Sequence, residues 1–145
     1  MRLVTQTDIL AKTFGDEKCI PILKDAGFEA LDWSFFGMEQ GRGIWCTDAW
    51  REHALQLKEI AAQCGIGFSQ AHAPFPSSKG EEGYDRAIRG WILRSMEAAA
   101  LMGVRNIVVH PMQELVYAVN EGKLWEENLE FYRSLIPHCE EHGIR

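Results

Sequence analysis

The sequence predicts an α/β protein made of repeated strand–helix units whose strands form a parallel sheet. Four helix-like stretches each end in a glycine and give way to a short apolar run, at Gly27, Gly65, Gly103 and Gly143. Successive glycines are 38, 38 and 40 residues apart, which is the combined length of a strand, a helix and two loops. A glycine after a helix adopts the left-handed backbone conformation, so the chain can turn directly into a strand. Strands joined by helical crossovers run parallel, so the repeat indicates a parallel sheet.

The first unit starts close to the N-terminus. We expect a strand over residues 2–6 and a helix over residues 16–26. Asp16 is placed as the N-cap of that helix, because a carboxylate can accept hydrogen bonds from the unpaired backbone N–H groups of the first turn. Pro21 is compatible with the helix because it lies near the first turn.

The second unit contains the most clearly amphipathic helix. A strand is expected over residues 28–33, followed by a glycine-containing loop over residues 35–47. Asp48 is placed to cap the next helix. Helical spacing puts six residues on one face of that helix: Trp50, Ala54, Leu57, Ile60, Ala61 and Cys64.

The third unit has a strand over residues 67–71 and a helix over residues 84–102. Between them lies the sequence HAPFPSSKGEEG, whose prolines and glycines exclude regular structure, and we expect a mobile or lid-like loop. The residues of the helix expected to face inward are Ile88, Trp91, Ile92, Ser95, Met96 and Ala99.

The fourth unit has a strand over residues 105–109 and a helix over residues 123–142. A short helical turn is expected before this helix, around residues 115–117. Pro137 lies inside the helix, where it removes one backbone hydrogen bond, so a bend without a break is expected there.

Four such units make half of an eight-stranded (β/α)8, or TIM, barrel. Residues 143–145 repeat the start of the earlier units. We therefore expect residues 1–145 to form a single partial domain, the N-terminal half of a barrel truncated before strand five. The open sheet would leave two edges and an apolar interior uncovered, so the alternative is that two copies complete one barrel. For the same reason the isolated chain is expected to self-associate as a homo-oligomer.

Composition is that of an ordinary globular domain. The 145 residues are 46% hydrophobic, and the net charge of −6 argues against a nucleic-acid partner. No apolar run approaches the roughly 20 residues of a membrane span, and no signal-peptide pattern is present, so a cytoplasmic protein with no membrane partner is expected. The cysteines form no CxxC pair and are interpreted as buried free thiols: Cys19, Cys46, Cys64 and Cys139.

Ligands of βα-repeat folds bind at the carboxyl ends of the strands. The residues at or just after those ends are Gln6, Asp8, Asp32, Trp33, His72 and His110. The two histidines hold nearly the same position in adjacent units, and each is followed within two residues by a proline. Neighbouring parallel strands lie about 4.8 Å apart, so both imidazoles are expected to reach one ion or one substrate. They are the strongest candidates in the chain.

Other side chains allow two interpretations. Asp32 is either a functional carboxylate or a strand-end cap. Four aromatic residues either form an apolar wall for a sugar ring or pack in the core: Trp33, Phe36, Trp45 and Phe75. The remaining histidines fall on helices and are expected at the surface: His53, His138 and His142.

The sequence resembles the sugar phosphate isomerase/epimerase family in four segments: SQAHAPF, IVVHP, AGFEALDWS and WEENLEFYRSLIPHCEEHGI. That family shares its barrel with xylose isomerase and with the apurinic-site DNA endonucleases. The resemblance covers the whole chain as the N-terminal half of such a barrel. Its motifs are specific for the superfamily and carry little information on the substrate.

The resemblance implies different roles for the histidines in different branches. In the sugar branch a divalent ion, commonly manganese, is held mainly by residues of the second half, and positions matching His72 and His110 line the substrate pocket. In the endonuclease branch the matching histidines bind zinc. The family usually has an acidic residue, commonly glutamate, at the position of Asp32. The glutamate expected after strand five, a metal ligand and proton-transfer residue, would lie beyond Arg145.

We therefore expect the N-terminal half of a divalent-metal-dependent (Mn or Zn) isomerase or epimerase. It would act on a sugar or sugar phosphate by proton transfer next to a carbonyl. The expected substrate-binding residues are Gln6, Asp32, Trp33, His72, Phe75 and His110. One alternative is an apurinic-site endonuclease-like zinc phosphodiesterase with His72 and His110 as metal ligands, and another is a non-catalytic half-barrel that pairs with another chain. The main acid–base residue is not expected within residues 1–145, so this chain alone should be inactive.

Overall fold

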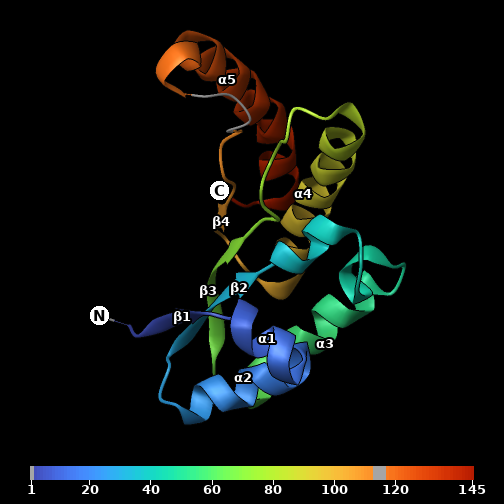
Figure 1. The fold of residues 1–145 in the computed structure, drawn as a ribbon. Helices are drawn as coiled ribbons and strands as arrows, with labels where there is room; N and C mark the ends of the chain where they lie inside the picture. The colour runs from blue at the N-terminus through green and yellow to red at the C-terminus, as the bar shows by residue number, and fades with distance from the viewer. Residues whose placement is uncertain (1, 113–116) are drawn as a thin grey trace.

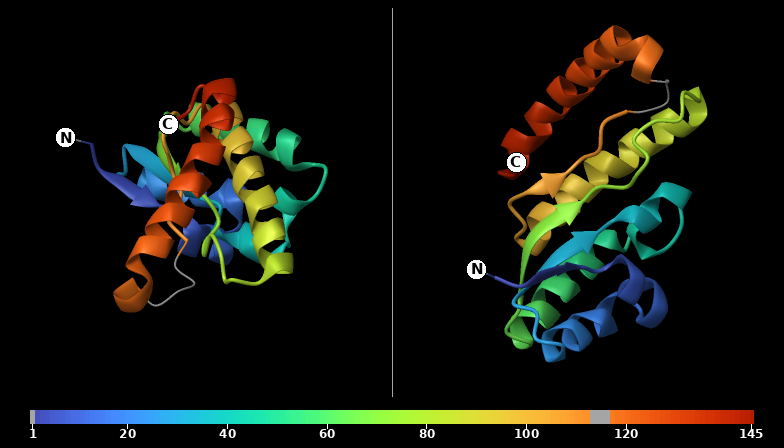
Figure 2. Two further views of the ribbon diagram at one scale, coloured as in Figure 1. Left: turned by 90° about the horizontal axis from the view of Figure 1, so that it is seen from above. Right: turned by 60° about the vertical axis from the view of Figure 1, so that its left-hand side comes forward.

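The computed structural model describes residues 2–112 and 117–145, and it shows one sheet of four parallel strands connected by helices (Figure 1). The strand order follows the chain, β1-β2-β3-β4. The elements are β1 Val4–Gln6, α1 Asp8–Phe14, α2 Asp16–Asp25, β2 Ala30–Ser34, η1 Phe36–Gln40, η2 Ile44–Cys46, α3 Trp50–Gln63, β3 Gly67–His72, α4 Glu82–Met102, β4 Ile107–Val108 and α5 Tyr117–His142. The helices α2, α3, α4 and α5 lie side by side in the order of the strands (Figure 2). The predicted fold class of four parallel strand–helix units is confirmed.

Each repeat closes its helix in the same way. The glycines after the four helices have φ values of 92°, 65°, 85° and 62° in chain order. The N–H of the residue after each glycine donates to a carbonyl five residues earlier, at 2.9–3.2 Å: Phe28 to Leu23, Ile66 to Ala61, Val104 to Ala99, and Ile144 to Cys139. This is the Schellman hydrogen bond, which satisfies an end carbonyl of the helix and redirects the chain. The predicted use of the glycines is confirmed.

The strand register changes once, between β2 and β3. Leu31 pairs with Phe68 but Asp32 pairs with Gln70, so one residue of β3 has no partner in β2. Beyond this bulge Asp32 is level with Gln70 on one side and with Gln6 of β1 on the other. Residues paired across parallel strands point to the same face, so the bulge brings three polar side chains into one row.

The helix-facing side of the sheet forms the apolar core. Leu31 and Trp33 of β2 are fully buried there. Helix residues that complete this cluster are Ile20, Leu23, Trp50, Ala54, Leu57, Ala61, Ala98, Ala99 and Met102. A second cluster between α4 and α5 contains Ile88, Ile92, Met96, Phe131 and Leu135. The predicted inward faces of α3 and α4 are therefore confirmed, although Ile60, Cys64 and Trp91 are only partly buried.

The opposite side of the sheet differs from the apolar interior that we expected. Its residues toward the carboxyl ends of β1, β2 and β3 are polar: Gln6, Asp32, Gln70 and His72. In β4 the residue level with His72 is the apolar Val108. Val4, near the start of β1, is an apolar residue of this face and is 38% exposed. The expectation of an apolar inner face is thus wrong near the strand ends, because the residues there alternate with core residues and carry hydrogen-bonding groups instead.

The last residue of the chain adds to the sheet beside β4. The N–H of Arg145 donates to the carbonyl of Arg105 at 2.8 Å, and the N–H of Ile107 donates to the carbonyl of Arg145 at 2.8 Å. Such alternating bonds to one residue are those of a parallel strand pair. The chain after α5 therefore begins the same strand geometry as the earlier units.

Both predicted aspartate caps are wrong. Asp16 is the first residue of α2 and Gly15 is its N-cap, while Ala49 is the N-cap of α3, with no side-chain cap hydrogen bond in either case. The carboxylate of Asp16 is used elsewhere, because it accepts a hydrogen bond from Trp45. In the second case the hydroxyl of Thr47 accepts from the N–H of Ala49 at 3.3 Å.

Three local features differ from the sequence interpretation. The helix α1 was not predicted, and it contains no buried residue. His53 is only 9% exposed, so the prediction that it lies at the surface is wrong. The helix α5 continues through Pro137 without a break, as expected, but its kink lies at Asn120 (φ −131°, ψ 17°), where none was predicted. The short turn expected around residues 115–117 lies mostly outside the described residues.

The four cysteines are free, but only Cys19 is fully buried, and the others are half-buried. Burial, followed by the nearby charge of Asp16, raises the pKa of the Cys19 thiol to about 12. Within the described ranges no helix has the length and apolar character needed to cross a membrane.

Candidate functional site

The candidate site lies at the edge of the sheet where β2, β3 and β4 end. It includes the segment that follows β4. Asp32 comes from β2, Gln70 and His72 come from β3, and His110 lies two residues past β4. Residues two apart in a strand point to the same face, so Gln70 and His72 both face Asp32. We call Asp32, Gln70, His72 and His110 the strand-end cluster.

Asp32 is the centre of the hydrogen bonds in this cluster. Its Oδ1 lies 2.9 Å from Nδ1 of His72, and its Oδ2 accepts from Nε2 of Gln70 at 2.6 Å. The side chains of Asp32 and His72 are only 11% and 17% exposed. Both carboxylate oxygens thus have protein partners in a largely buried setting.

The two predicted histidines come together. The ring centroids of His72 and His110 are 5.7 Å apart and the rings are inclined by 30°, so they stack. Burial, followed by the proximity of His72, lowers the pKa of His110 below its ordinary value of 6.5. His110 is therefore neutral at pH 7, with one ring nitrogen able to donate a hydrogen bond and the other able to accept one.

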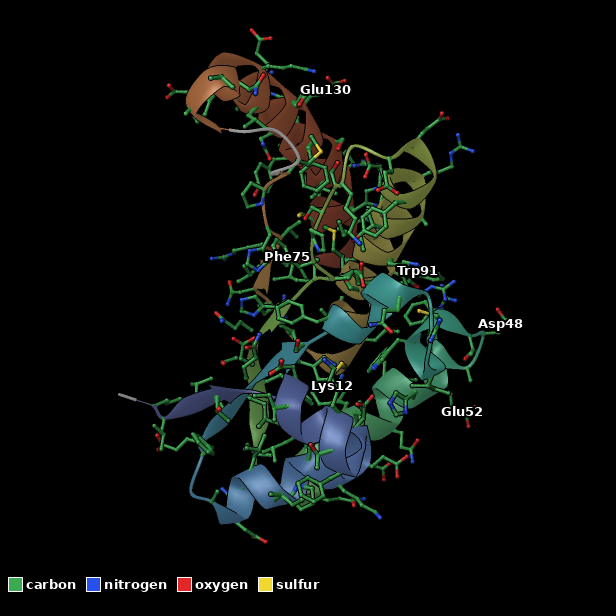
Figure 3. The ribbon with its side chains drawn as sticks, viewed as in Figure 1. Lys12, Asp48, Glu52, Phe75, Trp91 and Glu130 are labelled. Carbon is green, nitrogen blue, oxygen red and sulfur yellow. The ribbon has the colours of Figure 1, made fainter. Side chains whose placement is uncertain are left out.

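Two phenylalanines flank the histidines. The ring of Phe75, labelled in Figure 3, lies 4.6 Å from that of His110. The ring of Phe36 lies 5.8 Å from His72 and 6.3 Å from His110. Phe75 is 40% exposed, so it offers an accessible apolar surface beside the imidazoles.

The loop after β3 is irregular, as predicted, but it is held to the rest of the protein by hydrogen bonds. The hydroxyl of Ser77 donates to the carbonyl of His110 at 2.7 Å, and the hydroxyl of Tyr84 donates to the carbonyl of Pro76 at 2.9 Å. Ser78 donates to Asp85 at 2.9 Å. These bonds connect the loop carrying Phe75 to both α4 and the segment after β4.

Other predicted residues take different places. Gln6 is level with Asp32 in the neighbouring strand and is exposed on the same face. Trp33 is fully buried on the helix-facing side, where its ring contacts Trp45 and Phe68 at 6.1 and 5.7 Å. The structure therefore separates Trp33 and Trp45 from the cluster and leaves Phe36 and Phe75 beside it. Asp8 begins α1 and is half-buried.

Sequence reasoning missed two polar residues of this site. Gln70 precedes His72 by two residues, and this strand spacing was the available signal. Ser34 is level with His72 across the sheet. Its hydroxyl is buried and has no hydrogen-bond partner in the part of the chain that the structure describes.

These residues do not form a metal site by themselves. His72 and His110 offer two imidazoles, whereas zinc sites in proteins use at least three protein ligands. Among residues 2–112 and 117–145, no three or more histidine, cysteine, aspartate or glutamate side chains are grouped so that they could hold a metal ion. Asp32 is already bonded to two neighbours.

A second polar group lies among the helices α2, η2 and α3. A cavity of about 490 Å³ is lined by residues that include Asp16, Trp45 and His53. Inside it, Oδ2 of Asp16 accepts from Nε1 of Trp45 and contacts Nε2 of His53, both at 2.8 Å. This group consists of one carboxylate with two mostly buried neighbours, whereas the strand-end cluster combines two stacked histidines with an exposed aromatic ring, so we place the candidate site at the strand-end cluster.

Comparisons with models of protein families and with curated proteins find no match to this sequence. Solved structures do match the fold. A D-psicose 3-epimerase crystallised in the presence of D-fructose gives a TM-score of 0.70 at 12% identity, over 100% of this chain and 50% of that chain. A D-tagatose 3-epimerase-like protein gives 0.70 at 18% identity, over 100% and 51%.

A sugar phosphate isomerase/epimerase from Parabacteroides distasonis ATCC 8503 gives a TM-score of 0.60 at 18% identity, over 99% of this chain and 49% of that chain. The chain thus spans about half the length of the solved structures that it matches. At these identities the likeness concerns the fold. The chain has the fold of the N-terminal half of a TIM barrel, as found in sugar epimerases and in a sugar phosphate isomerase/epimerase.

Proposed function

We propose that the chain is the N-terminal half of a sugar isomerase or epimerase and that the strand-end cluster lines its substrate pocket. The observation that carries this proposal is the stacked His72–His110 pair, flanked by Phe36 and Phe75 at the carboxyl ends of the strands. In barrels of this class the carboxyl ends of the strands form the active-site face. The sugar epimerases with the same fold support the substrate class.

The chemistry of the cluster suits a sugar. Sugar hydroxyls need hydrogen-bond donors and acceptors, which Nε2 of His72, the ring nitrogens of His110 and the exposed Gln6 amide provide. Apolar C–H groups of a sugar need an apolar surface, which the exposed ring of Phe75 provides. A small number of polar groups placed among aromatic rings is typical of small-molecule sites.

The reaction we propose is proton transfer at a carbon next to a carbonyl. Removing that proton leaves the C–H electron pair in an enediolate, and returning a proton to the same or the adjacent carbon completes epimerisation or isomerisation. His72 and His110 would hold substrate hydroxyls, and the carboxylate that moves the proton would lie in the second half of the barrel. A divalent ion, Mn²⁺ or Zn²⁺, would polarise the carbonyl when bound, with most of its ligands in that second half.

We also propose that residues 1–145 are a partial domain. Arg145 already pairs with β4, and α5 exposes apolar side chains at helical spacing, among them Trp125, Leu129 and Ile136. The second half of a barrel would cover that face and add ligands to the cluster. Native mass spectrometry of the intact gene product tests this: a polypeptide near 16.5 kDa that forms dimers would favour two copies completing one barrel instead.

The runner-up is a zinc phosphodiesterase with His72 and His110 as ligands. The bond from His72 Nδ1 to Asp32 favours it, because metal-binding histidines usually donate their second N–H to a carboxylate. The net charge of −6 weighs against a DNA partner.

The test uses the intact gene product with D-fructose, D-psicose and D-tagatose, with Mn²⁺ or Zn²⁺ supplied separately. We expect new epimers by chromatography and uptake of deuterium from D₂O at the carbon that inverts. A His110→Ala variant should lose this exchange, and His138→Ala on α5 should retain it. Cleavage of a DNA duplex with an abasic site, without any sugar exchange, would replace this proposal with the phosphodiesterase. Sugar exchange that survives His110→Ala would exclude His110 from the site.

A further inference from the structure

We infer that Asp32 and Gln70 are positioning residues that hold His72 with its proton on Nδ1, so that the lone pair of Nε2 serves a substrate hydroxyl. The role toward substrate rests on the proposed function, whereas the proton position rests on the structure alone. Asp32 was expected to bind substrate itself. Both of its oxygens are instead bonded to protein groups, which points to an indirect role.

Donor and acceptor chemistry sets the proton position. An ionised carboxylate only accepts hydrogen bonds, so both of its close neighbours must donate. Gln70 donates through its amide at 2.6 Å, and the Nδ1 of His72, at 2.9 Å, must then carry the ring proton. In a neutral imidazole with a proton on Nδ1, the Nε2 atom is an acceptor.

The geometry around the ring keeps this arrangement in place. His72 stacks on His110 at one face and meets Phe36 edge-on, with ring inclinations of 30° and 73°. Asp32 lies in the middle strand pair of the sheet, where its backbone carbonyl accepts from the N–H of Thr7 at 3.1 Å. The carboxylate therefore sits on a rigid element, which favours precise placement of the group it holds.

The Nε2 atom of His72 is the nitrogen left for a ligand. In the described part of the chain it has no hydrogen-bond partner, while Nδ1 is engaged. An acceptor at this point selects a hydroxyl or N–H of the substrate, whereas the other tautomer would present a donor. Asp32 thus determines which kind of group His72 can receive, and it does so without touching the substrate.

The experiment is a long-range ¹H–¹⁵N correlation spectrum of the intact gene product labelled with ¹⁵N-histidine, at a pH where His72 is neutral. We expect His72 to show a protonated Nδ1 and an unprotonated Nε2. In Asp32→Ala this preference should be lost and the Nε2–H form should become populated. For sugar turnover we expect kcat to fall about 10-fold to 100-fold in Asp32→Ala with a smaller change in KM, by analogy with the loss seen when the carboxylate partner of a metal-binding histidine is removed.

Asp16→Ala is the matched control, because it removes the carboxylate from the other His–Asp pair. It should change the signals of His53 and leave those of His72 as in the unmodified protein. Gln70→Ala should weaken the Nδ1–H preference of His72 less than Asp32→Ala does, since it removes only the second donor to the carboxylate.

Three results decide the inference. A proton on Nε2 of His72 in the unmodified protein overturns it, and so does an unchanged tautomer in a folded Asp32→Ala. Loss of the Nδ1–H preference in Asp32→Ala supports it. If that loss is seen but the unmodified protein processes no sugar, the positioning holds and the proposed function fails, so the two failures are distinct.

Discussion

Residues 2–112 and 117–145 contain two histidine–aspartate pairs, which differ in the ring nitrogen that is bonded and in the surroundings of the imidazole. His72 bonds Asp32 through Nδ1 at an edge of the sheet, at 2.9 Å, and stacks on a second histidine. His53 bonds Asp16 through Nε2 in the helix layer, at 2.8 Å, and lies against the ring of Trp45 at 4.9 Å. A His–Asp pair alone therefore does not mark a site, and its place in the fold decides its role.

The helix-layer pair connects three elements. Asp16 is in the first turn of α2, His53 is in α3, and Trp45 lies in η2 and donates to the same Asp16 oxygen. All of these side chains are mostly buried. Their hydrogen bonds connect α2 of the first repeat to η2 and α3 of the second repeat. We interpret the His53–Asp16 pair as structural. We interpret the His72–Asp32 pair, which we call the strand-end pair, as functional.

The largest effect that we expect is a loss of catalytic efficiency when the histidines at the strand ends are removed. His72→Ala combined with His110→Ala should lower kcat/KM by about 100-fold or more while the fold is kept, because it removes both polar ring groups that face the substrate. Steady-state kinetics together with circular dichroism check this. The corresponding change at the other pair, His53→Ala, should leave the kcat/KM of the folded fraction nearly unchanged. Equal losses from both changes would contradict the division of roles.

The next effect concerns stability at the helix-layer pair. His53→Ala removes a buried hydrogen-bonding group and leaves the Asp16 carboxylate with one donor. We expect a loss of about 2 kcal/mol in the free energy of unfolding, measured by urea denaturation. His138→Ala, a half-buried histidine on α5, is the control and should cost less. A neutral His53→Ala would mean that the pair does not stabilise the junction.

The sequence allowed the fold and the place of the site to be predicted, because both depend on local signals. The glycine spacing fixes the repeat, and the strand ends follow from it, so His72 and His110 were found at the correct edge. Helix α1 was missed because it is only seven residues long and has no fully buried residue; Leu10 and Ala11 pack against the core but are only partly buried, which is too few positions to show a helical apolar period. The aspartate caps failed because tertiary partners of Asp16 outcompete a local cap.

The contacts inside the site could not be predicted in the same way. Asp32 meets His72 across 40 residues of sequence, and the match depends on the one-residue shift between β2 and β3. Nothing in the residues around Ser69 signals that shift. His53 was assigned to the surface because it is polar and helical, yet a partner 37 residues away makes its burial favourable.

A smaller effect tests the link between the two regions. Gly65 ends the helix that carries His53 and leads into the strand that carries His72. Its φ is 65°, and an added Cβ would meet no atom within 4 Å, so Gly65→Ala should cost about 1 kcal/mol through backbone strain alone. Gly67→Ala in β3 is the matched control, since that site is equally open and has no positive φ. Urea denaturation should show the loss only at Gly65, with kcat/KM of the folded protein unchanged in both. Equal effects would mean that the left-handed turn is not the cause.

The smallest effect we predict is in the pH dependence of stability caused by His110, the residue that stacks on His72 of the strand-end pair. Burial, followed by the nearness of His72, lowers the pKa of His110 in the folded state below the ordinary 6.5 that applies when the chain is unfolded. The unfolded chain therefore binds more protons in this range. The contribution of neutral His110 to stability is complete above pH 6.5 and is lost as the pH falls from there toward the lowered pKa.

Thermal unfolding from pH 8 to pH 5 should thus show a smaller drop in Tm for His110→Asn than for the unmodified protein. In His72→Ala the drop should become smaller but should persist, because burial, the larger cause, remains. If His110→Asn follows the same pH curve as the unmodified protein, the pKa of His110 is not lowered in the folded state, and pH does not distinguish the strand-end pair from the helix-layer pair.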